Sequence, residues 1–370
     1  MNARERFYGC VRRQGYDRIP VRHQYGTPEF HQRLYGRYGI DQEIWTQACG
    51  EVYRAVGPRY CGPNHEDRLK GCPPGSSVGC FGEIYAPWAY GSGEFTGHYP
   101  EAAYLPFAEI TDVKQLEGYS WPSPDWYDYS AIKERCQALR SQGFVVVYPA
   151  WSYDFMNCTA RTRGVTQTML DIGLRDPVFL ELIERRFQFE YEKDRRVLEA
   201  AGGLIDVMHF CEDLGGQNGP LISRRTFDDL FAPYFQRGLA EAHAHGALTQ
   251  MHVCGGVRPL IPHLIEIGLD ILDVVQVSAE GMDIEGLKED FGDSLVFAGS
   301  MCVQTFLGFG TPEGVRREVE KRLALFAEGG LILGPSHDIQ VHTPVENVIE
   351  MYRAAGTLDE LLLQGARSSA

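Results

Sequence analysis

The chain has 370 residues, which is enough for one large α/β domain or for two smaller domains. Its composition, 44% hydrophobic and 23% charged, is typical of a globular protein, and its net charge of −15 argues against a nucleic-acid-binding surface. An anionic substrate would therefore need a local basic group that acts against the overall negative field.

Neither a membrane segment nor a disulfide framework is expected. No apolar run approaches the roughly 18 residues of a membrane helix, and the residues Met1–Arg6 lack the apolar segment of a signal peptide. The ten cysteines are scattered and include no CxxC pair. We therefore expect reduced thiols and a cytoplasmic protein.

Short apolar runs alternate with amphipathic stretches along the chain. Ser223 and the pair Thr311-Pro312 are typical helix start signals. The predicted helices that separate the later strands cover residues 177–200, 226–245, 259–268 and 311–329. The predicted strands cover, in chain order, residues 19–25, 50–56, 144–149, 204–210, 248–254, 271–277, 295–299 and 331–334.

Eight strands that alternate with helices predict a parallel sheet closed into a (β/α)8 TIM barrel. An open doubly wound sheet is the alternative fold, but no strand ends in a GxGxxG sequence. We expect residues 1–370 to form a single barrel domain. Residues 60–126 are rich in Gly, Pro and aromatic side chains, and we interpret them as an insertion after the second strand that forms a hairpin cap or rim.

Polar side chains follow the predicted strands repeatedly. In a TIM barrel the carboxyl ends of the strands meet at one face, where catalytic residues are found. The sequence therefore predicts an active site at this barrel mouth. The residues at these strand ends are His23, Gln24, Trp151, Asp154, Glu212, Asp213, His252, Cys254, Gln276, Ser300 and His337.

His252 and Cys254 are the most informative pair in the chain. They are two residues apart at the end of a predicted strand, so both side chains are expected on one face, and the glycines 255 and 256 follow them. An imidazole nitrogen and a thiolate are half of a zinc site. His337 ends the last predicted strand and is the candidate third ligand. Three ligands with one open position are typical of a catalytic zinc.

The sequence resembles the uroporphyrinogen decarboxylase superfamily, on motifs at residues 212–223 (EDLGGQNGPLIS), 252–255 (HVCG), 334–340 (GPSHDIQ) and 343–347 (TPVEN). These motifs are closest to the branch of cobalamin-dependent zinc methyltransferases. The resemblance implies a (β/α)8 barrel in which the His-x-Cys pair and a third ligand after the eighth strand bind zinc. It also leaves a homodimer open.

Two departures from the family refine this interpretation. Well-known members of the methyltransferase branch have a cysteine as the third ligand, where this chain has His337. Two histidines and one cysteine make the metal a stronger Lewis acid, which favours polarising a substrate oxygen. The arginine-rich amino-terminal signature of the decarboxylases is not evident after Ile19-Pro20, where Val-Arg-His-Gln-Tyr stands instead.

Two carboxylates follow the fourth predicted strand. Glu212 and Asp213 are adjacent, so they are expected to point in opposite directions, and at most one faces the mouth. Both are candidate catalytic residues, and Glu212 is favoured as a fourth metal ligand or as a general acid. The alternative is that they cap the following turn.

Substrate contacts are predicted at two further strand ends. Gln276 is either a core hydrogen-bonding residue or a substrate contact. Tyr148, Trp151 and Tyr153 form an aromatic cluster after the third strand. This cluster either packs against the neighbouring insertion or forms a wall for an aromatic or methoxylated substrate.

The resulting hypothesis is a zinc-dependent methyltransferase. It would move a methyl group, by demethylation of a small substrate such as a methoxylated aromatic, to the corrinoid (cobalamin) of a separate protein. The corrinoid must come from a partner because the chain has no DxHxxG motif. The alternatives are transfer in the reverse direction, from methyl-cobalamin to an acceptor; a metal-free decarboxylase; and a non-catalytic corrinoid- or porphyrin-binding module.

Overall fold

The computed structural model describes residues 1–23 and 26–365, so the predicted site residue Gln24 lies outside the described part of the chain. Seven strands form one parallel sheet, and each strand pairs with its neighbours in chain order. These strands are β1 (Tyr53–Ala55), β7 (Val145–Pro149), β8 (Val207–Cys211), β11 (Leu248–His252), β12 (Ile271–Val274), β13 (Val296–Met301) and β14 (Leu331–Pro335).

Val21 closes this sheet into a barrel. It forms parallel bridges both to Glu51, just before β1, and to Leu333 in β14. Backbone hydrogen bonds continue on both sides: the Val52 amide donates to the Val21 carbonyl, and the Arg22 amide donates to the Leu333 carbonyl. The segment predicted as the first strand therefore takes the eighth strand position in the barrel. The predicted α/β barrel is confirmed.

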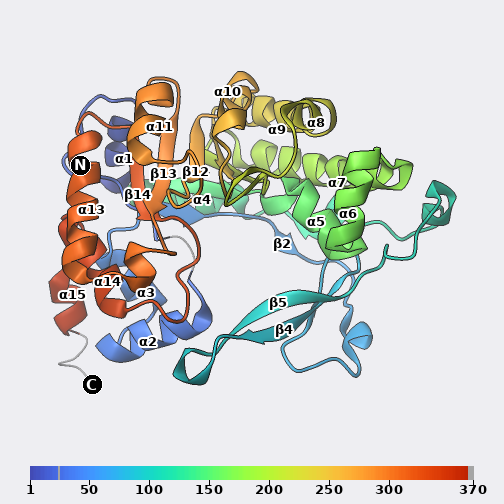
Figure 1. Cartoon of the computed structure of the whole chain (residues 1–370), viewed down its shortest axis with the longest axis horizontal. Coiled ribbons are helices and arrows are strands. Elements are labelled where there is room, and N and C mark those ends of the chain that lie inside the picture. Colours follow the sequence, from blue (N-terminus) through green and yellow to red (C-terminus); the bar gives the residue numbers. More distant parts are fainter. Residues whose placement is uncertain (24–25, 366–370) are drawn as a thin grey trace.

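Helices cover the outside of the barrel (Figure 1). Ser223 and Thr311 cap helices as predicted, because their hydroxyls accept hydrogen bonds from the amides of Thr226 and Gly314. The helix predicted over 226–245 is two helices, because Pro233 cannot donate a backbone hydrogen bond to the preceding turn. The main helices are α1 (Ala3–Val11), α2 (Pro28–Tyr38), α3 (Gln42–Ala48), α4 (Ile132–Ser141), α5 (Phe155–Arg163), α6 (Val165–Leu174), α7 (Pro177–Ala201), α8 (Arg224–Leu230), α9 (Ala232–Ala244), α10 (Ile261–Glu266), α11 (Ile284–Phe291), α12 (Phe306–Phe309), α13 (Pro312–Leu325), α14 (Val345–Ala354) and α15 (Glu360–Gly365).

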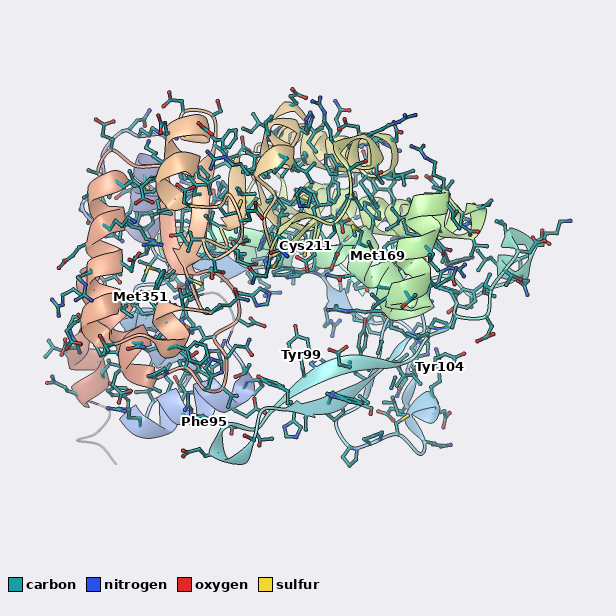
Figure 2. The ribbon with its side chains drawn as sticks, in the orientation of Figure 1. Phe95, Tyr99, Tyr104, Met169, Cys211 and Met351 are labelled. Carbon is teal, nitrogen blue, oxygen red and sulfur yellow. The ribbon has the colours of Figure 1, made fainter. Side chains whose placement is uncertain are left out.

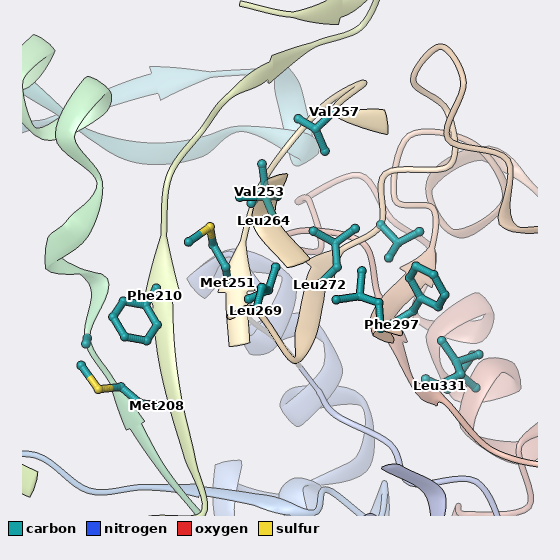
Figure 3. Packing of buried hydrophobic residues seen from close by; sticks show 14 of the residues in the cluster. Met208, Phe210, Met251, Val253, Val257, Leu264, Leu269, Leu272, Phe297 and Leu331 are labelled. Atoms are coloured by element: carbon teal, nitrogen blue, oxygen red, sulfur yellow. The ribbon is translucent and has the colours of Figure 1, made fainter. Parts of the chain in front are cut away.

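The strands are buried on both faces. Outward-facing side chains such as Phe210, Met251, Leu272 and Phe297 belong to the main hydrophobic core between strands and helices (Figure 3). The inward-facing residues at the amino-terminal end of the barrel form a second apolar cluster, which α1 covers with Phe7. Burial on both faces explains why these strands are continuous apolar runs in the sequence.

A polar layer lies inside the barrel above the inner apolar cluster. Arg22 donates two hydrogen bonds to the carboxylate of Asp273, and both side chains are buried. Gln250 Nε2 donates to the same carboxylate over 3.0 Å, and His209 Nε2 lies 3.0 Å from it. Tyr53 donates to Gln250 Oε1 over 2.8 Å. This layer supports the strand ends immediately above it.

Between β1 and β7 the chain leaves the barrel. β4 (Ile84–Tyr90) and β5 (Gly97–Tyr104) form an antiparallel hairpin, β3 (Ser77–Val78) pairs with β4, and β2 (Arg59–Tyr60) pairs with β6 (Tyr127–Asp128). One end of the hairpin contacts α2, where the His98 amide donates to Glu29 Oε1 over 3.0 Å. At the other end, the Phe107 amide donates to the Thr162 carbonyl of α5. The hairpin thus connects α2, which follows the Val21 strand, with α5, which follows β7 on the other side of β1 (Figure 1). Its assignment to an insertion over 60–126 in a single domain stays a prediction.

In the described residues, no helix combines the length and apolar character needed to cross a membrane.

Candidate metal centre at the barrel mouth

Three metal-capable side chains meet at the carboxyl ends of β11 and β14. His252 ends β11, Cys254 follows two residues later, and His337 lies two residues beyond β14. One donor atom from each of the three lies within 4.8 Å of the others. His252 Nε2 is 3.2 Å from Cys254 Sγ, and the two imidazole rings are 5.6 Å apart. The structure therefore brings together the three residues that the sequence predicted as metal ligands.

A glycine pair positions the Cys254 loop. Gly255 has a φ of +82°, and a Cβ at this position would lie 2.2 Å from the carbonyl carbon of Gly215. The Gly256 amide donates to the Gly216 carbonyl over 2.8 Å. Only glycine combines this backbone conformation with such close packing, so the loops after β8 and β11 touch backbone to backbone.

Of the two adjacent carboxylates, Asp213 is the one beside the donor cluster. Its Oδ1 accepts a hydrogen bond from the Cys254 amide over 3.3 Å and lies 3.8 Å from His252 Nε2. Its Oδ2 accepts a hydrogen bond from Asn157 Nδ2 over 2.7 Å. Asp213 is thus held from two sides with one oxygen directed toward His252.

Glu212 points the other way. Its fully buried carboxylate accepts hydrogen bonds from the amides of Phe155 (2.9 Å) and Met156 (3.1 Å), at the start of α5. Burial, and then the negative charge of Asp154, raise the pKa of Glu212 well above its usual value. The structure does not bring Glu212 to the three donors, because unpaired amides at a helix start attract a carboxyl group more strongly.

The donor set suits zinc. Burial lowers the pKa of His252 to about 4, so its imidazole is neutral near pH 7 and has a free electron pair for a metal. Burial, and then Asp213, raise the pKa of the Cys254 thiol, and a bound metal would remove the proton from such a thiol. Two imidazole nitrogens and one sulfur match the three-ligand pattern of catalytic zinc sites.

A cavity of about 300 Å³ opens beside Cys254 and His337. The predicted contact Gln276 lines it, and its Oε1 accepts a hydrogen bond from the Gly255 amide over 3.0 Å. Gln304 Oε1 accepts hydrogen bonds from Gln276 and Ser278. The cavity is lined by Cys254, Gln276, Val303, Gln304, Ser336, His337 and Gln340.

Several of these residues were not predicted. Ser336 and Gln340 lie in the same short motif as His337, which could have pointed to them. Gln304 follows β13 and Asn157 lies on α5, and no motif marks either residue. Asp273 is an acidic residue within an apolar strand, and this unusual placement was the available signal for the buried polar layer.

The aromatic cluster divides between the mouth and the core. The Trp151 ring lies 4.6 Å from the ring of His209 and 6.0 Å from that of His252, so it borders the donor cluster. Tyr148 is on the outward face of β7 and donates to Asp194 of α7 over 2.6 Å. Tyr153 is buried among the aromatic rings of the core, such as that of Phe210 at 5.1 Å. The structure brings only Trp151 to the mouth.

We expect Gly255→Ala to disrupt the centre. The new Cβ would collide with the Gly215 backbone and force an unfavourable φ, at a cost of about 1–3 kcal/mol for the backbone conformation alone. Chemical denaturation should show this loss, and zinc affinity measured by competition with a chelator should fall. Gly173→Ala, on α6 with open space around its Cβ position, is the matched control: it should leave zinc affinity unchanged, and it should not lower stability because alanine favours a helix more than glycine does. Unchanged zinc affinity in Gly255→Ala would contradict this account of the loop.

Comparisons with known proteins give a family match and a shared fold. Residues 206–358 match the family model for uroporphyrinogen decarboxylase (URO-D). No curated protein matches the chain. A solved methyltransferase from Methanosarcina mazei is 16% identical, with a TM-score of 0.62 over 96% of this chain and 98% of its own.

Two further solved structures are more distant. A B12-independent methionine synthase from Shewanella sp. W3-18-1 is 12% identical, with a TM-score of 0.47 over 95% of this chain and 98% of its own. A D-psicose 3-epimerase from Clostridium cellulolyticum H10 is also 12% identical, with a TM-score of 0.39 over 72% and 96%. The resemblance predicted from the motifs is therefore confirmed: residues 206–358, which include the donors and both adjacent carboxylates, match the model of the uroporphyrinogen decarboxylase family.

Proposed function

We propose that the protein is a zinc-dependent methyltransferase that moves a methyl group from a small methylated substrate to the corrinoid of a separate protein. The observation that carries this proposal is the meeting of two imidazoles and one thiol beside an open cavity at the barrel mouth. Three donors with space for a further ligand are typical of catalytic rather than structural zinc. The whole-chain fold shared with a methyltransferase supports the same proposal.

His252, Cys254 and His337 would hold the metal, which when bound supplies Lewis acidity toward an oxygen, nitrogen or sulfur of the substrate. Gln276 and Gln304 offer amide groups on one side of the cavity and orient the substrate there. The indole of Trp151 lies on the other side of His252 and offers a flat surface for an aromatic substrate.

Asp213 is the carboxylate placed to give a proton to the leaving heteroatom. Its Oδ1 lies 3.8 Å from His252 Nε2, so a substrate atom bound beside His252 would be within its reach. Asn157 and the Cys254 amide hold Asp213 in place. A corrinoid brought by the partner protein would accept the methyl group, and Asp213 would supply the proton to the heteroatom that leaves.

A decarboxylase is the second candidate, because the family model that matches residues 206–358 is that of uroporphyrinogen decarboxylase. A metal-free decarboxylase has no use for the His-x-Cys pair, and this distinguishes the two proposals. A homodimer remains part of the proposal only by analogy with the family.

Metal content and methyl transfer test the proposal together. We expect about one zinc per chain by elemental analysis, and zinc-dependent methylation of a reduced corrinoid protein when methoxylated compounds are supplied. A His252→Ala, Cys254→Ala double variant should lose both the metal and the transfer. The matched control, Cys61→Ala with His65→Ala, removes one thiol and one imidazole outside the cluster and should keep both.

The outcomes separate the alternatives. A protein that binds no zinc even when zinc is supplied would overturn the methyltransferase proposal and favour the decarboxylase. Zinc binding with transfer only from methyl-cobalamin to an acceptor would show that the methyl group moves in the direction opposite to the one proposed. Zinc binding without any turnover of substrate would favour a binding module.

Asp213→Asn should separate proton transfer from metal binding. We expect kcat to fall by about 10²- to 10⁴-fold, as for loss of a general acid, with zinc stoichiometry unchanged because Asp213 is outside the donor cluster. The control Glu212→Gln should instead lower stability by about 1–3 kcal/mol, because an amide NH2 group would face the amides at the start of α5. Loss of zinc from Asp213→Asn would show that Asp213 is a ligand and contradict its proposed role.

A further inference from the structure

Arg161 shares a face of α5 with Asn157. The two residues are four positions apart, which places them one above the other on the helix surface. Asn157 contacts Asp213, which borders the donor cluster. Arg161 therefore lies about one helical turn, roughly 6 Å along the axis, from a residue that touches the proposed active site.

The guanidinium of Arg161 has no partner in the described part of the chain. It is half-buried, yet it forms neither a hydrogen bond nor an ion pair with any described residue. Its neighbour Arg163 shows the usual pattern for a buried arginine: it pairs with Asp171 and donates to the carbonyls of Phe107 and Ile110. Five donors on Arg161 are thus available to a ligand.

Tyr99 faces the barrel from the opposite side. It lies on β5 with 37% of its surface exposed, and Figure 2 shows its ring pointing from the hairpin toward the mouth. The hydroxyl lies within the electrostatic influence of four charged side chains: burial and Asp338 raise the pKa of Tyr99, Arg161 lowers it, and Glu101 and Asp213 raise it. Tyr99 is therefore close to the same space as Arg161.

Arg161 carries its positive charge in a mostly negative environment. The chain has a net charge of −15, and Asp154, Asp213 and Asp338 all lie near the mouth. Burial opposes the charge of Arg161, but Cys158, Tyr85, Asp154 and Tyr99 outweigh it and raise its pKa, so the side chain stays positive. An anionic substrate needs a local basic group against this field, and Arg161 is placed to supply it.

We propose that Arg161, with the Tyr99 hydroxyl opposite, binds a carboxylate of the substrate, so that the methylated substrate is an acid such as a methoxylated aromatic carboxylate. The flat guanidinium binds a carboxylate through two parallel hydrogen bonds, and the hydroxyl donates a third. The inference that this acid carries a transferable methyl group rests on the proposed function above. Binding of its carboxylate by Arg161 does not require methyl transfer.

Equilibrium binding tests this inference directly. The probes are 4-methoxybenzoate, its neutral amide 4-methoxybenzamide and the cation 4-methoxybenzylamine, measured by calorimetry with the full chain loaded with zinc. We expect the wild-type protein to bind the acid about 10- to 100-fold more tightly than the amide, as for a hydrogen-bonded charged group. Arg161→Met should remove this preference, and Arg161→Lys should keep part of it.

Arg225→Met is the matched control. It makes the same change in net charge at an exposed side chain on α8, and it should keep the preference for the acid. Circular dichroism would establish that each variant is folded. If Arg161→Met does not fold, Arg161→Lys provides the test, because it should retain only part of the preference. Equal binding of acid and amide by the wild type, tighter binding of the amine, or a preference that survives in Arg161→Met would overturn the inference. A preference for the acid in a protein that transfers no methyl group would support carboxylate binding by Arg161. It would count against the proposed function only.

Discussion

Closure of the barrel is the constraint on which the candidate site depends. The donors come from β11 and β14, which are separated by two other strands, so a flat sheet would keep them far apart. Val21 pairs with segments at both edges of the sheet and forces it to curve completely. Curvature then brings His337 within reach of His252 and Cys254, although more than 80 residues separate them in the sequence. The buried ion pair between Arg22, next to Val21, and Asp273 adds a link across the barrel interior to β12.

Much of this arrangement could be predicted from the sequence, because it follows from short-range rules. Apolar runs that alternate with amphipathic stretches predicted the parallel strands. The two-residue spacing of His252 and Cys254 placed both side chains on one face. The strand-end position of His337 placed it at the same mouth once a barrel was predicted. Each inference needed only local spacing and one assumption about the fold.

The remaining details depend on tertiary contacts that no local pattern encodes. Because side chains alternate along a strand, Glu212 and Asp213 were predicted to point in opposite directions. Which of them faces the donor cluster is decided by the start of α5, more than 50 residues away in the sequence, whose amides bind Glu212. Tyr148 lies on the strand that Trp151 and Tyr153 follow, yet the environment of both tyrosines is set by α7 and the core aromatics. The direction of the β4–β5 hairpin, and with it the placement of Tyr99, depends on its contacts with α2 and α5.

The proposed metal centre, proton donor and anion-binding side chain lie between the barrel mouth and the β4–β5 hairpin. The central claim is that His252, Cys254 and His337 bind one zinc ion. X-ray absorption at the zinc edge of the loaded protein tests this claim most directly. We predict one sulfur neighbour at about 2.3 Å and two imidazole nitrogens at about 2.0–2.1 Å. A zinc environment of oxygen neighbours alone, without sulfur, would contradict it.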